Sequence, residues 1–373
     1  MKVKIQQFLG MNHSWAVVGW GISEALIELG HELHLFSTDG IKHLPEKLKP
    51  YLIGYTELNK LEKVYGRTPD SEYDCQISYT AMKNFPYYLS NGSTNRFGVW
   101  VYEWAGYNIL PVGFAKNYKY CDKILSPSNF GKKIYIDSGV PADNVVVIPH
   151  GINEKDYRSP SKLNIKTNKK FKICVNVAQN HTRKNIPGLL DAYGKAFTKK
   201  DDVCLIFKTT FKPATAQFEI SVKDCLDKFY KKYKDHAELI IMTDFIDNMA
   251  DLYNSCDAIF TMSHCEGFYF PGLEGLALGK LSIAPNHGGQ LDFLNSSNSL
   301  LIDGKEVRAD PKSMYWTNNN NATWFQPSVD DAVEKLRFAY QNFESLNSKI
   351  DKEQILKDYN WVSITKRIVE LCK

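Results

Sequence analysis

Two glutamates, Glu266 and Glu274, are the residues of this 373-residue sequence whose spacing most directly suggests chemistry. An apolar run over residues 258–262 precedes them and is typical of a buried strand, whereas residues 272–278 favour a helix. We therefore expect Glu266 in a loop and Glu274 in the first helical turn, where both carboxylates can accept hydroxyl groups of a ligand. The alternative is that Glu274 only caps the helix and that Glu266 is a solvated loop residue.

The residues between the two glutamates favour a ligand site at this corner between strand and helix. Gly267 and Gly272 let the backbone approach a ligand closely, and Pro271 fits just inside a helix start. In an open parallel sheet, ligands bind beyond the carboxyl ends of the strands, where the N–H groups of a helix N-terminus face anions. The sequence therefore predicts an anion-binding site here.

Basic residues and glycines elsewhere could hold phosphate. Arg183 and Lys184 lie between a predicted strand and a predicted helix, where the guanidinium fork and the ammonium group can neutralise a diphosphate; the alternative is a solvated basic pair. Lys208, at the next strand end, is a further candidate. Gly19 and Gly21 lie where a loop leads into a predicted helix and can bring backbone amides to a phosphate, although a plain tight turn is equally compatible with this incomplete dinucleotide fingerprint.

Strands and helices alternate along both halves of the chain. The predicted strands are residues 3–9, 31–37, 74–79, 97–102, 123–125 and 145–148, then 171–177, 203–208, 239–242, 258–262, 281–284 and 300–302. The predicted helices are residues 19–29, 129–138, 186–198, 216–233, 247–256 and 272–278. Such alternation is typical of parallel sheets covered on both faces. The Asn-rich run 318–321 is expected to be an exposed loop.

The composition is that of a soluble protein with two domains. The length exceeds one ordinary core, and 43% hydrophobic and 24% charged residues are usual values. A net charge of +4 does not argue for nucleic acid, while a basic patch that faces a membrane stays open. The sequence has no spanning segment and no signal peptide, so we expect a cytoplasmic protein, and its eight scattered cysteines are expected to be buried free thiols.

Several segments resemble one enzyme family. The stretch EGFYFPGLEGLALGK from Glu266 resembles the paired-glutamate motif of the family 4 retaining glycosyltransferases, and VAQNHTRKNIPGLLDAY resembles their diphosphate-binding segment. Residues 126–130 and 147–153 resemble the end of their first domain, and residues 359–367 resemble their closing helix. The resemblance is strongest over residues 175–301 and weakest over residues 40–96.

This resemblance implies an α/β protein with two doubly wound Rossmann-like domains that face each other across a cleft, the GT-B fold. The first domain would be residues 1–152 with the returning C-terminal helix, 359–373; residues 153–170 would be a linker and residues 171–358 the nucleotide-sugar domain. The enzyme would transfer a hexose, with retention, from GDP-mannose or a UDP-hexose to a glycan or lipid-linked acceptor. No cofactor, metal or nucleic acid is expected, and peripheral contact with a membrane is possible.

The resemblance also implies roles for residues. Glu274 would bind the ribose and Glu266 the donor sugar, while Arg183 and Lys184 would bind the diphosphate. Backbone amides of the intervening segment would hold sugar and phosphate; its residues are Gly267, Phe268, Tyr269, Phe270, Pro271 and Gly272. Glu103, which follows a predicted strand where relatives carry a histidine, could grip the acceptor or the sugar or could be a structural acid. His150 would lie at the cleft and is a further catalytic candidate.

Two other classes of protein stay open. Epimerases and phosphorylases can share this two-domain shape, although no cofactor-binding lysine of a phosphorylase is evident. A non-catalytic carbohydrate-binding scaffold is the third alternative, against which both glutamates and the Arg–Lys pair argue. Residues 286–294, NHGGQLDFL, resemble mannosyltransferase-like members and favour GDP-mannose weakly.

Overall fold

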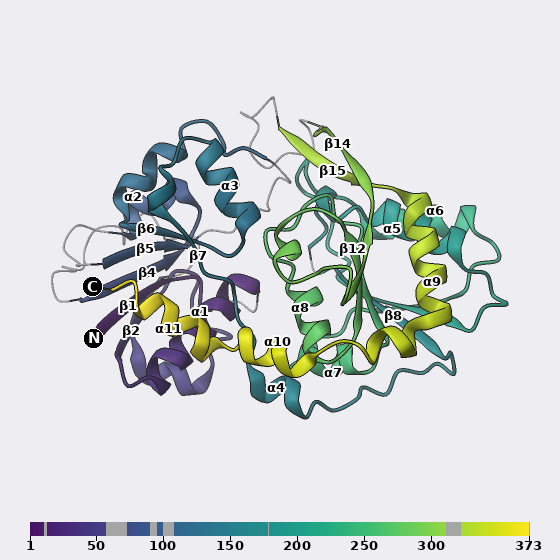
Figure 1. Cartoon of the computed structure of the whole chain (residues 1–373), viewed down its shortest axis with the longest axis horizontal. Helices are drawn as coiled ribbons and strands as arrows, with labels where there is room; N and C mark the ends of the chain where they lie inside the picture. The colour runs from purple at the N-terminus through teal and green to yellow at the C-terminus, as the bar shows by residue number, and fades with distance from the viewer. Residues whose placement is uncertain are drawn as a thin grey trace. The chain divides into compact units, whose positions relative to one another are not determined.

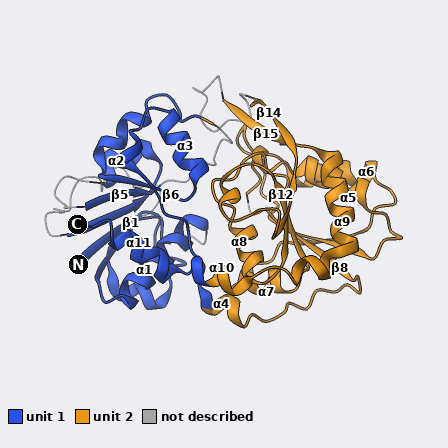
Figure 2. Ribbon diagram, viewed as in Figure 1, with its two compact units in different colours: residues 1–101, 109–154, 357–373 blue, residues 102–108, 155–356 orange. Residues whose placement is uncertain are grey.

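The protein consists of two compact units, shown in different colours in Figure 2. Unit 1 contains residues 1–101, 109–154 and 357–373, and unit 2 contains residues 102–108 and 155–356. The computed structural model describes residues 1–10, 13–56, 73–89, 95–99, 108–177, 179–310 and 322–372. The boundaries predicted at residues 152/153 and 358/359 remain a prediction.

Unit 1 is built on a seven-stranded sheet whose neighbouring strands are all parallel, in the order β3-β2-β1-β4-β5-β6-β7. The strands are β1 (Lys2–Gln7), β2 (Glu32–Ser37), β3 (Leu52–Tyr55), β4 (Cys75–Tyr79), β5 (Asn95–Val99), β6 (Lys123–Ser126) and β7 (Val145–Val147). The helices are α1 (Ser14–Glu28), α2 (Phe85–Tyr88), α3 (Asn129–Asp137) and α11 (Trp361–Val369), with the short 3-10 helices η1 (Glu46–Tyr51), η3 (Met82–Asn84), η4 (Ala115–Tyr120) and η5 (Ala142–Asn144). The C-terminal helix α11 returns to unit 1 and packs beside α1 (Figure 1).

Unit 2 has a parallel six-stranded sheet in the order β10-β9-β8-β11-β12-β13. Its strands are β8 (Phe171–Val177), β9 (Val203–Thr209), β10 (Glu238–Met242), β11 (Ala258–Phe260), β12 (Leu281–Pro285) and β13 (Ser299–Ile302); β14 (Gly304–Arg308) and β15 (Thr323–Pro327) form an antiparallel ribbon. The helices are α4 (Glu154–Arg158), α5 (Ile186–Ala196), α6 (Val222–Lys232), α7 (Met249–Asn254), α8 (Phe270–Ala277), α9 (Val329–Asn347) and α10 (Lys352–Asp358), with 3-10 turns η6 (Thr182–Lys184) and η7 (Gly289–Asp292). The first residue of α4 and the last two residues of α10 belong to unit 1.

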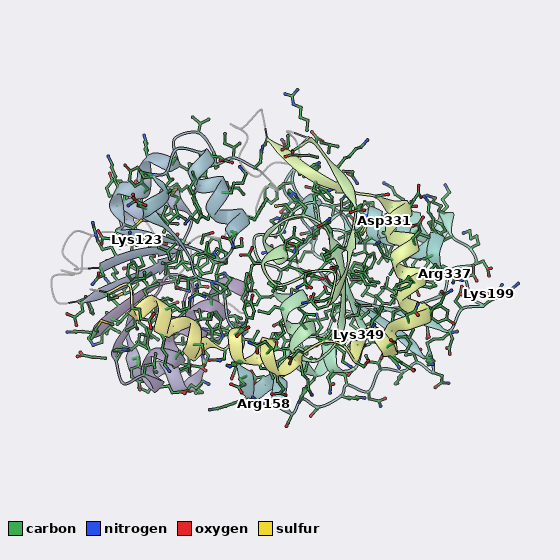
Figure 3. All side chains as sticks on the ribbon, viewed as in Figure 1. Lys123, Arg158, Lys199, Asp331, Arg337 and Lys349 are labelled. Atoms are coloured by element: carbon green, nitrogen blue, oxygen red, sulfur yellow. The ribbon has the colours of Figure 1, made fainter. Side chains whose placement is uncertain are left out.

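Both sheets therefore have the doubly wound order, in which the chain starts in the middle and builds outward in both directions. Apolar runs fill the central strands because helices cover a parallel sheet on both faces. In unit 2, α9 packs against α5, and Arg337 of α9 (Figure 3) lies over the rings of Phe197 and Tyr340 and binds Asp201 at 2.6 Å. The predicted fold class is confirmed, and all eight cysteines are free thiols, as predicted, with only Cys372 not fully buried.

The predicted start of the first helix is wrong, and this changes the interpretation of its glycines. Helix α1 begins at Ser14 because the imidazole of His13 accepts a hydrogen bond from the Trp15 N–H, at 3.0 Å, and so caps the helix. Gly19 and Gly21 consequently lie inside α1 and not in a phosphate loop. A Cβ at Gly21 would lie 2.1 Å from the Trp361 ring, so this glycine permits α11 to pack closely.

Some elements were not predicted. Strand β3 lies at the sheet edge, and its alternating exposure gives a weak apolar signal. The ribbon β14–β15 was missed because β14 is mostly exposed and polar. Helix α6 begins at Val222, where Ser221 caps it, six residues later than predicted. The Asn-rich run 318–321 lies outside the described residues.

Candidate functional site

The strand order of unit 2 reverses between β8 and β11, and this is where doubly wound sheets bind ligands. The loop after β8 contains Arg183 and Lys184 in the turn η6, and the loop after β11 contains Glu266. Both loops leave carboxyl ends of adjacent parallel strands, so they meet at one edge of the sheet. The topology thus brings together residues that the sequence places more than eighty positions apart.

Glu266, Arg183 and Lys184 form a buried ion cluster. Lys184 Nζ lies 2.6 Å from Glu266 Oε1, and Arg183 Nη1 lies 3.1 Å from Glu266 Oε2 and 3.0 Å from the carbonyl oxygen of Cys265. Glu266 and Arg183 are each only 5% exposed. The cluster carries two positive charges and one negative charge, so it retains one net positive charge for an anionic ligand.

The surroundings keep Glu266 ionised. Burial alone would raise its pKa, but the charges of Lys184 and Arg183, with hydrogen bonds from Lys184 and Ser263, lower the pKa to about 2. The carboxylate is therefore charged at every physiological pH. The predicted role of Arg183 and Lys184 in binding a diphosphate remains a prediction, and the structure adds that both cations already have Glu266 as a partner.

Backbone contacts fix the two loops against each other. Asn185 has a left-handed backbone with φ of 49°, caps α5 by accepting from the Gly188 N–H, and donates to the carbonyl of Met262 at 3.1 Å. The N–H of His264 donates to the Arg183 carbonyl at 2.7 Å. Because these contacts join the loop after β8 to the loop after β11, the ion cluster rests on a rigid support.

A third loop supports Glu266 from the side of β12. The N–H of Gly289 donates to the Glu266 carbonyl at 2.7 Å. Its neighbour Gly288 has a φ of +99°, and a Cβ there would lie 2.8 Å from the same carbonyl oxygen. Both the backbone conformation and the close approach therefore require glycine.

Helix α8 begins at Phe270, and Pro271 fits its start as expected. The residue before the helix, Tyr269, is left-handed with φ of 72°, a conformation that costs free energy for a non-glycine residue. Pro271 has no N–H and cannot donate to a ligand, which corrects the expectation of an amide at each position of 268–272. Glu274 is the fifth residue of α8, so the predicted place in the first turn is wrong and Glu274 does not cap the helix.

Glu274 lies among tyrosines. Tyr157 of α4 donates its hydroxyl to Glu274 Oε1 at 2.7 Å, and Tyr253 of α7 donates a second hydrogen bond. Glu274 keeps some accessible surface, but its carboxyl group is buried. Burial raises the pKa of Glu274 to about 7, although the two hydrogen bonds act in the opposite direction and lower it. The two glutamates thus have opposite electrostatic environments within one motif.

The β14–β15 ribbon holds two histidines that the sequence did not single out. His264 stacks on Trp324 with ring centroids 4.2 Å apart, and its Nδ1 lies 2.9 Å from the carbonyl oxygen of Phe325. His287, which follows β12, stacks on Phe325 at 4.9 Å. The ribbon therefore braces the loops after β11 and β12, and no local pattern in the sequence joins these distant segments.

The remaining predicted site residues are less closely tied to the ion cluster. Lys208 lies near the end of β9, which pairs with β8. Burial lowers the pKa of Lys208, and the negative charge of Asp244 only partly offsets this by raising it. Phe268 is buried against Phe270 and Phe293. Gly267 precedes Phe268 in the loop. A Cβ at Gly272 would lie 2.5 Å from the Tyr269 ring, so close packing against this ring requires glycine at position 272.

In unit 1, the predicted site residue His150 is buried. It is 3% exposed, its Nε2 lies 3.5 Å from the Tyr79 hydroxyl, and burial lowers its pKa to about 3. Burial therefore favours the neutral imidazole, and the predicted catalytic role of His150 remains a prediction. Glu103 lies outside the described residues, and its predicted role stays a prediction.

Within the described ranges, no group of three or more histidine, cysteine or carboxylate side chains is arranged to hold a metal ion. None of the helices there combines the length and the apolar character that crossing a membrane requires.

Comparison with known proteins establishes the fold. No family model and no curated protein sequence matches the chain. Among solved structures, a glycosyltransferase from Rickettsia africae is similar with a TM-score of 0.70 and 16% identity over 100% of this chain and 98% of that one. HepE of Anabaena in complex with UDP-glucose has a TM-score of 0.70 and 15% identity over 100% and 99%. Sucrose-phosphate synthase of Thermosynechococcus elongatus has a TM-score of 0.70 and 13% identity over 100% and 98%. The chain therefore has the two-domain GT-B fold.

Proposed function

We propose that the protein is a retaining glycosyltransferase that transfers a hexose from a nucleotide-diphosphate sugar to a glycan or lipid-linked acceptor. The observation that carries the proposal is the pairing, at the switch point of unit 2, of a cationic cluster with a second, tyrosine-bound glutamate. A donor of this kind has an anionic diphosphate between two hydroxyl-rich sugars. Its parts therefore match the two environments in chemistry.

Each part of the site has a role in this proposal. Arg183 and Lys184 neutralise the charge that develops on the leaving diphosphate, a task that preorganised cations perform well. Glu266 accepts hydroxyl groups of the donor sugar, and Glu274 accepts the ribose hydroxyls. The cluster supplies positive charge from the chain itself, so we propose transfer without a metal or other cofactor.

Fewer observations bear on which base and which sugar the donor carries. HepE was crystallised with UDP-glucose, which supports a uridine donor, while residues 286–294 of this chain favour GDP-mannose. We infer an enzyme of the cytoplasm that meets its acceptor at a membrane when that acceptor is lipid-linked.

Calorimetry with UDP and GDP, followed by assays with UDP-glucose and GDP-mannose, tests the proposal. We expect one nucleotide to bind and its sugar to be transferred, or to be hydrolysed slowly with release of nucleotide diphosphate. Conversion of the donor to an epimer without release would indicate an epimerase. Sugar binding with no nucleotide affinity would indicate a scaffold, and either result overturns the proposal.

A further inference from the structure

Glu274 is held by a tyrosine from the segment that joins the two units. Helix α4 spans Glu154–Arg158, at the boundary between unit 1 and unit 2, and its Tyr157 hydroxyl lies 2.7 Å from Glu274 Oε1. Tyr157 is 8% exposed. A buried phenol with a carboxylate partner has a fixed direction, since breaking the bond would leave both groups poorly solvated.

We propose that Tyr157 is a positioning residue of the nucleotide site, which orients the carboxylate of Glu274 and keeps it available as an acceptor for the ribose hydroxyls. This inference rests on the proposed function. A carboxylate offers about four lone-pair sites, so the bond from Tyr157 leaves room for two hydroxyls of a ligand. Tyr253, fixed by a 2.8 Å hydrogen bond from Asn176 of β8, supports the carboxylate from a second direction.

The position of Tyr157 also affects the protonation of Glu274. Among the described residues, the titratable groups that face Glu274 are Tyr157 of α4, Tyr253 of α7 and Tyr269 before α8, and none of these described groups is a cation. Hydrogen bonds from the first two lower the pKa of Glu274, while burial raises it. Loss of one hydroxyl therefore raises that pKa further and reduces the ionised fraction at neutral pH, and the ionised form accepts hydrogen bonds from ribose hydroxyls more strongly than the protonated form.

Polar contacts lie at and before the ends of helix α4. Arg158 Nη1 lies 2.9 Å from Glu353 Oε2 on α10, and α10 also lies at a boundary between the units. The N–H of Ile152 donates to the carbonyl of Tyr359 at 2.7 Å. Because the Arg158–Glu353 pair is exposed and contributes little, Tyr157 owes its fixed place mainly to its own burial and to its hydrogen bond with Glu274.

Tyr157→Phe tests the inference, with UDP and GDP as probes in calorimetry between pH 6 and 9. We expect roughly tenfold weaker binding near pH 6, a smaller loss near pH 9, and a pH inflection of affinity displaced upward from that of the wild type. The phosphate of the ligand titrates equally against both proteins, so only their difference is informative. Tyr253→Phe should move the inflection in the same direction and is a second route if Tyr157→Phe does not fold.

Tyr193→Phe is the matched control, because this buried hydroxyl of unit 2 donates to the Glu238 carbonyl at 2.6 Å and not to Glu274. It should leave nucleotide affinity and its pH inflection unchanged. Wild-type affinity with an unmoved inflection in folded Tyr157→Phe overturns the inference, provided that Glu274→Gln weakens binding. If the wild type binds neither nucleotide, the proposed function fails instead.

Discussion

Substituting Glu266 by glutamine tests whether the buried ion cluster stabilises unit 2. Glutamine keeps the size of the side chain and resembles a protonated carboxyl group, so the substitution removes the negative charge alone. Arg183 and Lys184 then lose their shared partner inside the protein, where an uncompensated charge is costly. We expect a clear loss of stability at neutral pH.

The magnitude follows from the pKa of Glu266, which falls from an ordinary value of 4.5 to about 2 in the folded protein. At 1.36 kcal/mol for each pH unit, this gap corresponds to roughly 3 kcal/mol. Because the folded-state pKa is the lower one, the contribution is complete above the unfolded pKa and is lost as the pH falls toward the folded pKa. The linkage relation leaves most of this contribution at pH 4 and less than half of it at pH 3.

Urea unfolding followed by circular dichroism at several pH values measures this difference between Glu266→Gln and the wild type. The control is Asp227→Asn, an exposed carboxylate 2.9 Å from Lys223, where an ion pair contributes little and the free energy of unfolding should change by less than about 0.5 kcal/mol. Equal stability of Glu266→Gln and wild type near pH 7 would refute the reasoning. So would a difference that does not shrink toward pH 3.

Three further predictions concern the site. Glu274→Ala should weaken the binding of free nucleotide diphosphate and of intact donor by a similar factor, worth roughly 1.5–3 kcal/mol. Glu266→Gln should lower turnover without weakening the binding of free nucleotide diphosphate. Calorimetry that shows lost nucleotide binding in Glu266→Gln and intact binding in Glu274→Ala would contradict these roles. Gly288→Ala should destabilise unit 2 by on the order of 1–3 kcal/mol, because its φ is +99°; unchanged melting counts against this. Transfer should persist in EDTA, and activity that EDTA abolishes and manganese restores would contradict a metal-free site.

Much of the fold could be predicted because buried parallel strands are apolar runs. Residues 171–177 match β8 at both ends, since a strand covered on both faces tolerates few polar residues. The same rule fails for β14, whose residues are mostly exposed. Helix α1 was started too late because a histidine cap is not among the usual N-cap residues.

The site could be predicted only in its parts. The order of the strands places Arg183 and Glu266 at one switch point, but no local pattern shows that both cations contact Glu266. Tyr157 was assigned to a linker because few apolar residues surround it in the sequence. Its contact with Glu274, 117 residues away, depends on how α4 and α8 pack in three dimensions.

The opposite pKa values of the two glutamates indicate how a donor would be oriented. Both carboxyl groups are withdrawn from bulk water, so burial pushes both pKa values upward, and only the neighbours differ. Two cations reverse the effect at Glu266, whereas the titratable groups that face Glu274 within the described ranges are phenols, and Glu274 stays near the middle of its titration at neutral pH. A diphosphate interacts most favourably with the cations. Ribose hydroxyls interact most favourably with a carboxylate that is not already paired with a cation. We therefore infer that the phosphates lie toward Arg183 and Lys184 and the nucleoside toward Glu274.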